Sequence, residues 1–387
     1  MDFLNGNIKP MYFKYLSAAF GSAMISSVYS IVDTAMVGQY HGPQGTAALA
    51  VVAPVWNIIY SLGLLVGIGG SVIFSTRRGS GKSDGSEHQY FTAAVIGAVI
   101  LSILAWIGVL GFQRPVLTFF GAGLATAIGA GISFLVMLTH FFSRKNTLRL
   151  IKPENLLRRL QEIAVTGFST FFIDVAMGIL TVLFNRQIMQ YLGASALAIY
   201  GPIIQVSTFV QCCAYSVGQA SQPIISTNFG AGKGERIKET LRLALWTTGF
   251  FGVFWTALSM AFPNAYIRIF MTPTPEILDM APAIVRTYAL SFLLLPFNIF
   301  STYYFQAILK PKAAFVVSVA RGLVISGILI LTLPVLVRAD AIWFAMPVTE
   351  LLVMVYAALT MRVCTKALPQ GPACMDAASC NAAENLI

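Results

Sequence analysis

The stretch S-T-R-R-G-S-G-K at Ser75–Lys82 recurs as S-T-N-F-G-A-G-K at Ser226–Lys233, 151 residues later. The same offset relates other pairs on both sides of this motif: Gln39 and Gln190, Tyr40 and Tyr191, Gly42 and Gly193, Phe119 and Phe270. Self-similarity at one fixed offset indicates an internal duplication. The sequence therefore predicts two homologous halves.

The composition predicts that both halves lie in a membrane. Of the 387 residues, 57% are hydrophobic and only 10% are charged. About 20 helical residues cross a hydrocarbon core of about 30 Å. Ten apolar runs are long enough: 11–38, 46–76, 90–112, 122–143, 164–192, 196–228, 241–263, 281–307, 313–336 and 340–362. We expect an all-α, polytopic membrane protein with about ten transmembrane helices.

The two halves differ in length. After Phe119 the register breaks, and the next match, Leu135–Met137 with Leu352–Met354, is 217 residues apart, so the first half lacks 66 residues. That length is enough for two crossings. We expect an N-terminal lobe of four helices over residues 1–150 and a C-terminal lobe of six over 151–366. A disordered cytoplasmic tail is expected over 367–387.

Basic residues orient the predicted helices. Nineteen Lys and Arg lie between the runs on one side, and three lie on the other: Arg114, Arg268 and Arg338. Basic loops stay on the cytoplasmic side, so we expect both termini there. The net charge of +10 follows from this bias, and no nucleic-acid partner is expected.

The Gly-Lys loops do not predict a nucleotide site. A phosphate-binding loop needs a glycine five residues before its Gly-Lys, where this chain has Thr76 and Thr227. We expect tight cytoplasmic turns, with Gly79 and Gly230 ending a helix. The five cysteines lie in a predicted span or in the tail, which predicts neither a disulfide nor a metal site. No catalytic residue or cofactor is indicated, so an enzyme is not expected.

Three acids lie inside predicted spans: Asp33, Asp174 and Glu350. A charge there costs at least about 2.5–3.5 kcal/mol unless it is neutralised or solvated. Asp33 and Asp174 continue polar stripes on one helix face, so each is expected to face water or protein. The functional interpretation is a carboxylate that binds and releases a proton. The alternative is a structural acid held by neighbouring hydroxyls.

Several motifs, in this order, resemble the multidrug and toxic compound extrusion (MATE) family of cation-coupled antiporters. They are V-D-T-A-M-V-G at 32–38, A-A-L-A at 47–50, L-A-T-A-I at 124–128, Y-L-G-A-S-A-L-A-I-Y-G-P-I at 191–203, Q-P-I-I-S-T-N-F-G-A-G-K at 222–233 and Y-F-Q-A-I-L-K at 304–310. The resemblance implies two six-helix lobes around a cleft that alternates between inward-facing and outward-facing states. A proton or sodium gradient would drive export of organic cations from a bacterial cell, across its plasma or inner membrane.

The resemblance also implies site residues and a departure. The family's fourth and fifth helices would lie between Phe120 and Gly121, where the repeat predicts the shortfall. The ion-coupling residues expected here are Asp33, Thr126, Asp174 and Glu350; an Asn and an Asp of the missing fifth helix have no counterpart. The substrate-binding residues expected along the cleft are Tyr29, Met36, Met177, Asn185 and Arg186. Aromatic and thioether side chains suit flat hydrophobic cations, although ordinary helix packing is their alternative role.

Three functions stay open at this point. The first is export of organic cations by antiport. The second is a flippase for a lipid-linked substrate, which a cationic cleft would favour, and the third is an internally deleted, inactive transporter. Because the first lobe lacks two helices, we expect membrane lipid, a second copy or another partner to cover it. Small residues between Gly121 and Ser133 would permit close helix approach.

Overall fold

Every element that the structure describes is helical. This computed structural model describes the backbone of residues 2–81, 85–111, 141, 147–270 and 273–368. Within these ranges it also describes the side chains, except those of residues 26–57, 106, 108–111 and 266. Within these residues, eight helical runs are long and apolar enough to cross a membrane. The predicted all-α, polytopic class is confirmed, while the predicted span 122–143 lies almost wholly outside the described residues.

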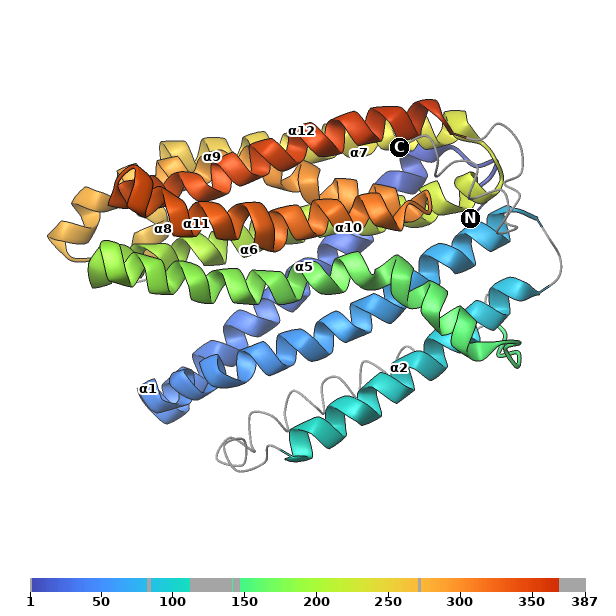
Figure 1. The fold of residues 1–387 in the computed structure, drawn as a ribbon, viewed down its shortest axis with the longest axis horizontal. Coiled ribbons are helices and arrows are strands. Elements are labelled where there is room, and N and C mark those ends of the chain that lie inside the picture. Colours follow the sequence, from blue (N-terminus) through green and yellow to red (C-terminus); the bar gives the residue numbers. More distant parts are fainter. Residues whose placement is uncertain (1, 82–84, 112–140, 142–146, 271–272, 369–387) are drawn as a thin grey trace.

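From Leu156 onward the helices follow one another with connections of a few residues. The bounds of the described helices are α1 Ile8–Gly79, α2 Ser86–Gly111, α5 Leu156–Tyr191, α6 Gly193–Gly230, α7 Gly234–Ala261, α8 Pro263–Phe270, α9 Pro275–Ala307, α10 Pro311–Val319, the π-helix η3 Ala320–Val324, α11 Ile325–Leu336, the 3₁₀-helix η4 Ala339–Phe344 and α12 Ala345–Lys366. In Figure 1 they lie lengthwise, and α10, η3 and α11 together make one crossing.

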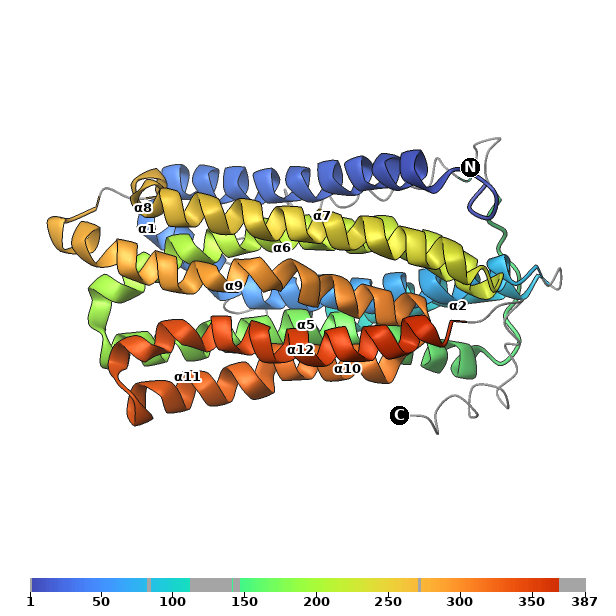
Figure 2. The ribbon, with the colours of Figure 1, turned by 90° about the horizontal axis from the view of Figure 1, so that it is seen from above.

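Helix α1 crosses the bundle and returns. A straight helix of its 72 residues would be about 108 Å long. The segment directly before α1 and the last residue of α1 instead reach the same end of α6: the Phe3 carbonyl accepts from Asn228 Nδ2 at 3.1 Å, and Gly79 packs against Thr227. Figure 2 shows the outward and returning segments. This element therefore accounts for the predicted spans 11–38 and 46–76.

Aromatic side chains hold the centre of the second half together. Phe184 of α5 stacks on Tyr200 of α6, with ring centroids 5.1 Å apart. Tyr200 also meets Tyr288 of α9 edge to face at 6.1 Å, and all three residues are buried. Such pairs add about 0.5–1.5 kcal/mol each beyond their buried area. Helices α5, α6 and α9 consequently form one packed unit.

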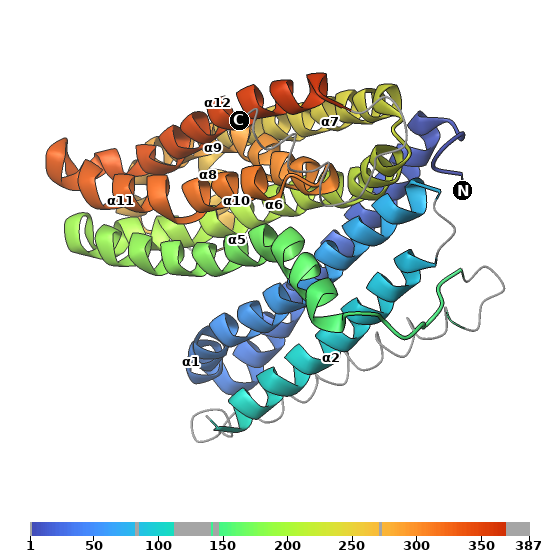
Figure 3. The ribbon, with the colours of Figure 1, turned by 45° about the vertical axis from the view of Figure 1, so that its right-hand side comes forward.

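Helices α1 and α2 are inclined to the helices of the second half. Figure 3 shows α1 and α2 beside α5–α12 near the N-terminus and diverging from them toward the opposite end. The halves meet mainly where α1 packs against α5 and α6, and we call this surface the seam.

Candidate functional site

Asp174 lies on the seam. Ser61 of α1 donates a hydrogen bond from Oγ to Asp174 Oδ2 at 3.3 Å, and the Tyr215 hydroxyl of α6 bonds the same carboxyl group. Ser61 is buried and Asp174 is half-buried. The polar face predicted for this helix therefore brings an ionisable group to a point where three helices from both halves meet.

A second polar cluster lies inside the second half, where α9 meets α5 and α6, and it has no charge. Gln306 of α9 donates from Nε2 to Thr170 Oγ1 at 2.8 Å and to the Thr166 carbonyl at 3.2 Å. Its Oε1 accepts from Gln222 of α6 at 3.5 Å. These amides are buried and satisfied by each other and by α5, as buried polar groups require.

A polar cavity adjoins Gln222. Its volume is about 230 Å³, and α1 and α6 line it with Ile68, Ser71, Ser75, Gln219, Gln222, Pro223 and Ser226. The lining offers hydroxyls and amides without a charge. A cavity of this size, with several hydrogen-bonding partners, suits ordered water or a small neutral polar group.

The repeated motif closes the seam at one end. A β-carbon at Gly79 would lie 1.9 Å from the Thr227 oxygen, and one at Gly230 would lie 1.8 Å from the Thr76 oxygen. The glycine of each copy thus packs against the threonine of the other copy: Gly79 against Thr227, and Gly230 against Thr76. Gly79 and Gly230 are the last residues of α1 and α6, so the predicted helix ends are confirmed. The motif brings two backbones together here.

A comparable crossing joins α1 to α5. A β-carbon at Gly69 would lie 2.1 Å from the Ile163 oxygen, and one at Gly167 would lie 1.8 Å from the Leu65 oxygen. Small residues permit such close backbone approach between membrane helices. The returning segment of α1 is therefore fixed to the second half at two levels.

The lysine of the second motif copy holds the N-terminal segment. Lys233 Nζ donates to the Leu4 carbonyl at 2.9 Å, and Arg236 Nη2 donates to the Gly6 carbonyl at 2.7 Å. Both cations donate these hydrogen bonds to carbonyl groups of this chain. The nucleotide interpretation therefore gains no support from the motif's surroundings.

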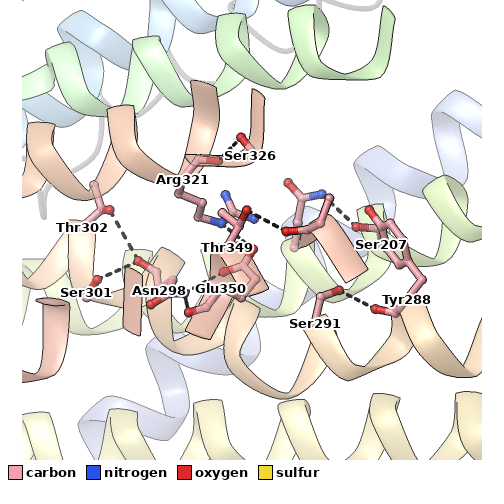
Figure 4. Close-up of polar contacts among 12 residues, drawn as sticks. Ser207, Tyr288, Ser291, Asn298, Ser301, Thr302, Arg321, Ser326, Thr349 and Glu350 are labelled. Carbon is pink, nitrogen blue, oxygen red and sulfur yellow. Dashed lines mark hydrogen bonds and ion pairs between the residues drawn. The ribbon is translucent and has the colours of Figure 1, made fainter. Parts of the chain in front are cut away.

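Inside the second half, a buried ion pair joins three elements (Figure 4). Arg321 Nε of η3 lies 2.8 Å from Glu350 Oε1 of α12, and the two side chains are 1% and 0% exposed. Asn298 of α9 donates from Nδ2 to Glu350 Oε2 at 2.6 Å and to the Glu350 carbonyl at 2.8 Å. Arg321 sits in a π-helix, a distortion found frequently at functional sites.

This cluster keeps unused hydrogen-bonding capacity. Nη1 and Nη2 of Arg321 and Oδ1 of Asn298 are buried and have no hydrogen-bond partner in the part of the chain that the structure describes. Buried polar groups are nearly always paired, so the cluster can accept a water molecule or exchange partners. Sequence reasoning missed Arg321. Its signal was an arginine inside the apolar run 313–336, where an ionisable residue is by default functional.

A comparison with known families identifies the chain. The MatE family model matches residues 18–125 and 170–331. The chain belongs to the MatE family. The resemblance inferred from the motifs is thereby confirmed.

Two curated relatives of this MatE chain come from bacteria. It is 25% identical over 199 residues to the probable multidrug resistance protein YoeA of Bacillus subtilis, covering 50% of this chain and 42% of that protein. It is 27% identical over 266 residues to the multidrug export protein MepA of Staphylococcus haemolyticus, covering 65% of this chain and 57% of MepA. The chain spans about half the length of the curated relatives it matches.

Solved structures share the MatE fold. One, described as the outward-facing conformation of a multidrug resistance MATE family transporter, aligns with a TM-score of 0.78 at 16% identity, covering 95% of this chain and 98% of that one. MATE in the bent conformation aligns with a TM-score of 0.83 at 16% identity, covering 95% and 97%. At such low identity these alignments show a common fold.

The structure separates the residues predicted for the MatE site. Glu350 bonds Arg321 and Asn298 whereas Asp174 bonds Ser61, so the two carboxylates belong to different clusters. Of the other predicted residues, Met177 is half-buried against the core, and Asn185 and Arg186 are exposed on α5. The structure places Tyr29, Asp33 and Met36 in α1 but does not describe their side chains. Thr126 lies outside the described residues.

Proposed function

We propose that this chain is a secondary transporter that exports organic cations in exchange for protons or sodium ions. The observation that carries the proposal is the half-buried Asp174 carboxylate, hydrogen-bonded to Ser61 across the seam. The relatives described as multidrug resistance and multidrug export proteins support the substrate class. An ionisable group inside a membrane-spanning helix is by default part of a substrate, ion or proton pathway.

The chemistry follows from competition for one negative charge. The ionised Asp174 carboxylate attracts either an organic cation or the coupling ion, and binding of one removes the attraction for the other. Since the carboxylate touches helices of both halves, its charge state biases how the halves meet. By family resemblance, Asp33 and Thr126 add a further coupling site in the first half.

The proposal takes the end that carries the N-terminus as cytoplasmic. Arg77, Arg78, Lys233 and Arg236 gather there, which fits the retention of basic loops on the cytoplasmic side of a bacterial plasma or inner membrane.

Efflux by vesicles tests the proposal. Asp174→Asn is expected to abolish efflux of a fluorescent cation driven by a pH gradient or by a sodium gradient, at normal membrane levels. Asp279→Asn, which removes an exposed carboxylate in the early turns of α9, is the matched control and should transport normally. Full gradient-dependent efflux by Asp174→Asn would refute the role of this carboxylate.

A further inference from the structure

A crevice lies where α7, α8 and α9 meet, at the end of the bundle opposite the N-terminus (Figures 1 and 2). Its volume is about 660 Å³, and its lining consists of Ala261, Phe262, Pro263, Asn264, Ala265, Arg268, Ile269, Pro282 and Arg286. This described lining includes two guanidinium groups, one amide and no carboxylate. The crevice therefore favours a ligand with negative charge.

The two arginines come from different helices. Arg286 of α9 donates from Nε to the Met260 carbonyl at 3.2 Å, which fixes its guanidinium at the end of α7. Arg268 lies on α8, and neither arginine forms a salt bridge with a carboxylate among the described residues. Planar guanidinium groups suit bidentate recognition of phosphate. The crevice thus presents two such groups to one ligand.

The surface around the crevice is apolar and exposed. Phe262 is 60% exposed and Ile269 is 73% exposed. Farther from the end of α7, Phe254 and Phe250 are also exposed. They share one helix face with Ala261, because steps of seven residues (Ala261 to Phe254) and four residues (Phe254 to Phe250) return to the same side of a helix. A continuous apolar track therefore leads away from the crevice along α7.

The position of the crevice along α7 corresponds to the boundary between the hydrocarbon core and the lipid headgroups. α7 has 28 residues, or about 42 Å of helix, which exceeds a hydrocarbon core of about 30 Å. Its last turn, and with it the Arg286 contact to Met260, therefore lies near the headgroup region. The apolar face of α7 lies in the hydrocarbon.

We propose that this crevice binds an anionic phospholipid of the adjacent leaflet, with its phosphate between Arg268 and Arg286 and an acyl chain along Phe254 and Phe250. The charge of the crevice matches the headgroup, and the apolar track matches the chain. Both arginines lie at the end that carries few basic residues, so they do not belong to the basic face that orients the protein. The binding is separate from transport and does not depend on the Asp174 mechanism.

Native mass spectrometry of the full-length protein, released from phosphatidylglycerol or phosphatidylcholine vesicles, tests the proposal. We expect retention of phosphatidylglycerol to exceed that of phosphatidylcholine roughly thirtyfold, since the two arginines each contribute on the order of 1 kcal/mol near anionic lipid. The double variant R268Q/R286Q should lose this preference. Arg338→Gln, an exposed arginine between α11 and α12 at the same end, is the matched control and should keep it.

Three results would overturn the proposal. Equal retention of the two lipids would show that the crevice does not recognise the headgroup charge. An equal loss of the phosphatidylglycerol preference in Arg338→Gln would show that the preference is a general effect of surface arginines. Thermal stabilisation by inorganic phosphate equal to that by phosphatidylglycerol vesicles would assign the crevice to a free anion. Melting temperatures of the variants close to that of the parent would show that they fold, so a lost preference would reflect lost binding.

Discussion

At the scale of single residues, the Arg321–Glu350 pair shows how charge is held inside a helix bundle. Each side chain is almost fully buried, so neither can be hydrated by bulk water. Removing one partner of a buried pair costs about 3–5 kcal/mol because the other charge is left unpaired. Replacing both partners with apolar side chains is often neutral or stabilising. The difference between these outcomes can be measured.

We expect Arg321→Met and Glu350→Leu each to destabilise the protein by about 3–5 kcal/mol, and the double variant R321M/E350L to recover most of the loss. Thermal unfolding in detergent, followed by size-exclusion fluorescence, measures this. The exposed pair Lys238–Glu235, at 2.7 Å, is the control: Glu235→Gln should change stability by no more than about 1 kcal/mol. If the double variant is as unstable as the single variants, the two side chains stabilise the protein by more than neutralising each other's charge.

The seam carboxylate gives a second prediction at this scale. Ser61→Ala removes the hydroxyl that bonds Asp174, so the carboxylate loses a donor but keeps its charge. We expect efflux to weaken by roughly fivefold to tenfold, the equivalent of one hydrogen bond of about 1–1.5 kcal/mol, while the dependence on the gradient persists. Initial efflux rates at several external pH values measure it. Complete loss of efflux would indicate that Ser61 is itself an essential part of the site.

At the scale of elements, the duplicated Thr-x-x-Gly sequence makes its own contact surface. Each glycine faces a backbone oxygen at the end of the other repeat, so the two copies are complementary to each other. A β-carbon there cannot be accommodated by a side-chain rotation, because the obstructing atoms belong to the backbone. The helices must separate instead.

Gly79→Ala and Gly230→Ala are therefore expected to open this end of the seam and to destabilise the protein by about 1–3 kcal/mol, as overpacking does. Spin labels on Arg78→Cys and Glu239→Cys, in a background without native cysteines, report the separation by electron–electron distance measurement. Gly63→Ala is the control, because a β-carbon at Gly63 on the same helix meets nothing within 4 Å. An unchanged distance distribution in both seam variants would contradict the expected separation.

At the scale of the whole molecule, the inequality of the halves stays a prediction. It rests on the break in the repeat after Phe119, and the span 122–143 lies almost wholly outside the residues that the structure describes. Only 35 residues separate Arg114 from Arg149, or about 53 Å of helix. One crossing fits in this length, while three would need about 60 residues.

Cysteines placed at successive positions from 114 to 149 are expected to show one protected stretch, with the two ends labelled from opposite sides of the membrane. The same experiment across α12, with Arg338→Cys and Arg362→Cys, is a control on a crossing that the structure describes. Two or more protected stretches separated by accessible positions would contradict a first lobe of four helices.

The sequence by itself determined the helical membrane class, the duplication, the ends of α1 and α6, and the polar face that carries Asp174. Each is a property of composition or of short-range pattern: apolar length, an offset between copies, or spacing along one helix. The physical cause of each lies within one segment. Local patterns are therefore sufficient to find them.

Only the tertiary structure decided which groups meet. Ser61 and Asp174 are 113 residues apart, Arg321 and Glu350 are 29 apart, and Asn298 is 52 from Glu350. Helical spacing shows which side of each helix is polar, but not which helix that side will face, because partner choice depends on how all the helices pack together. For the same reason the repeated glycines could be recognised as helix ends in the sequence, and only the fold showed that each copy packs against the other.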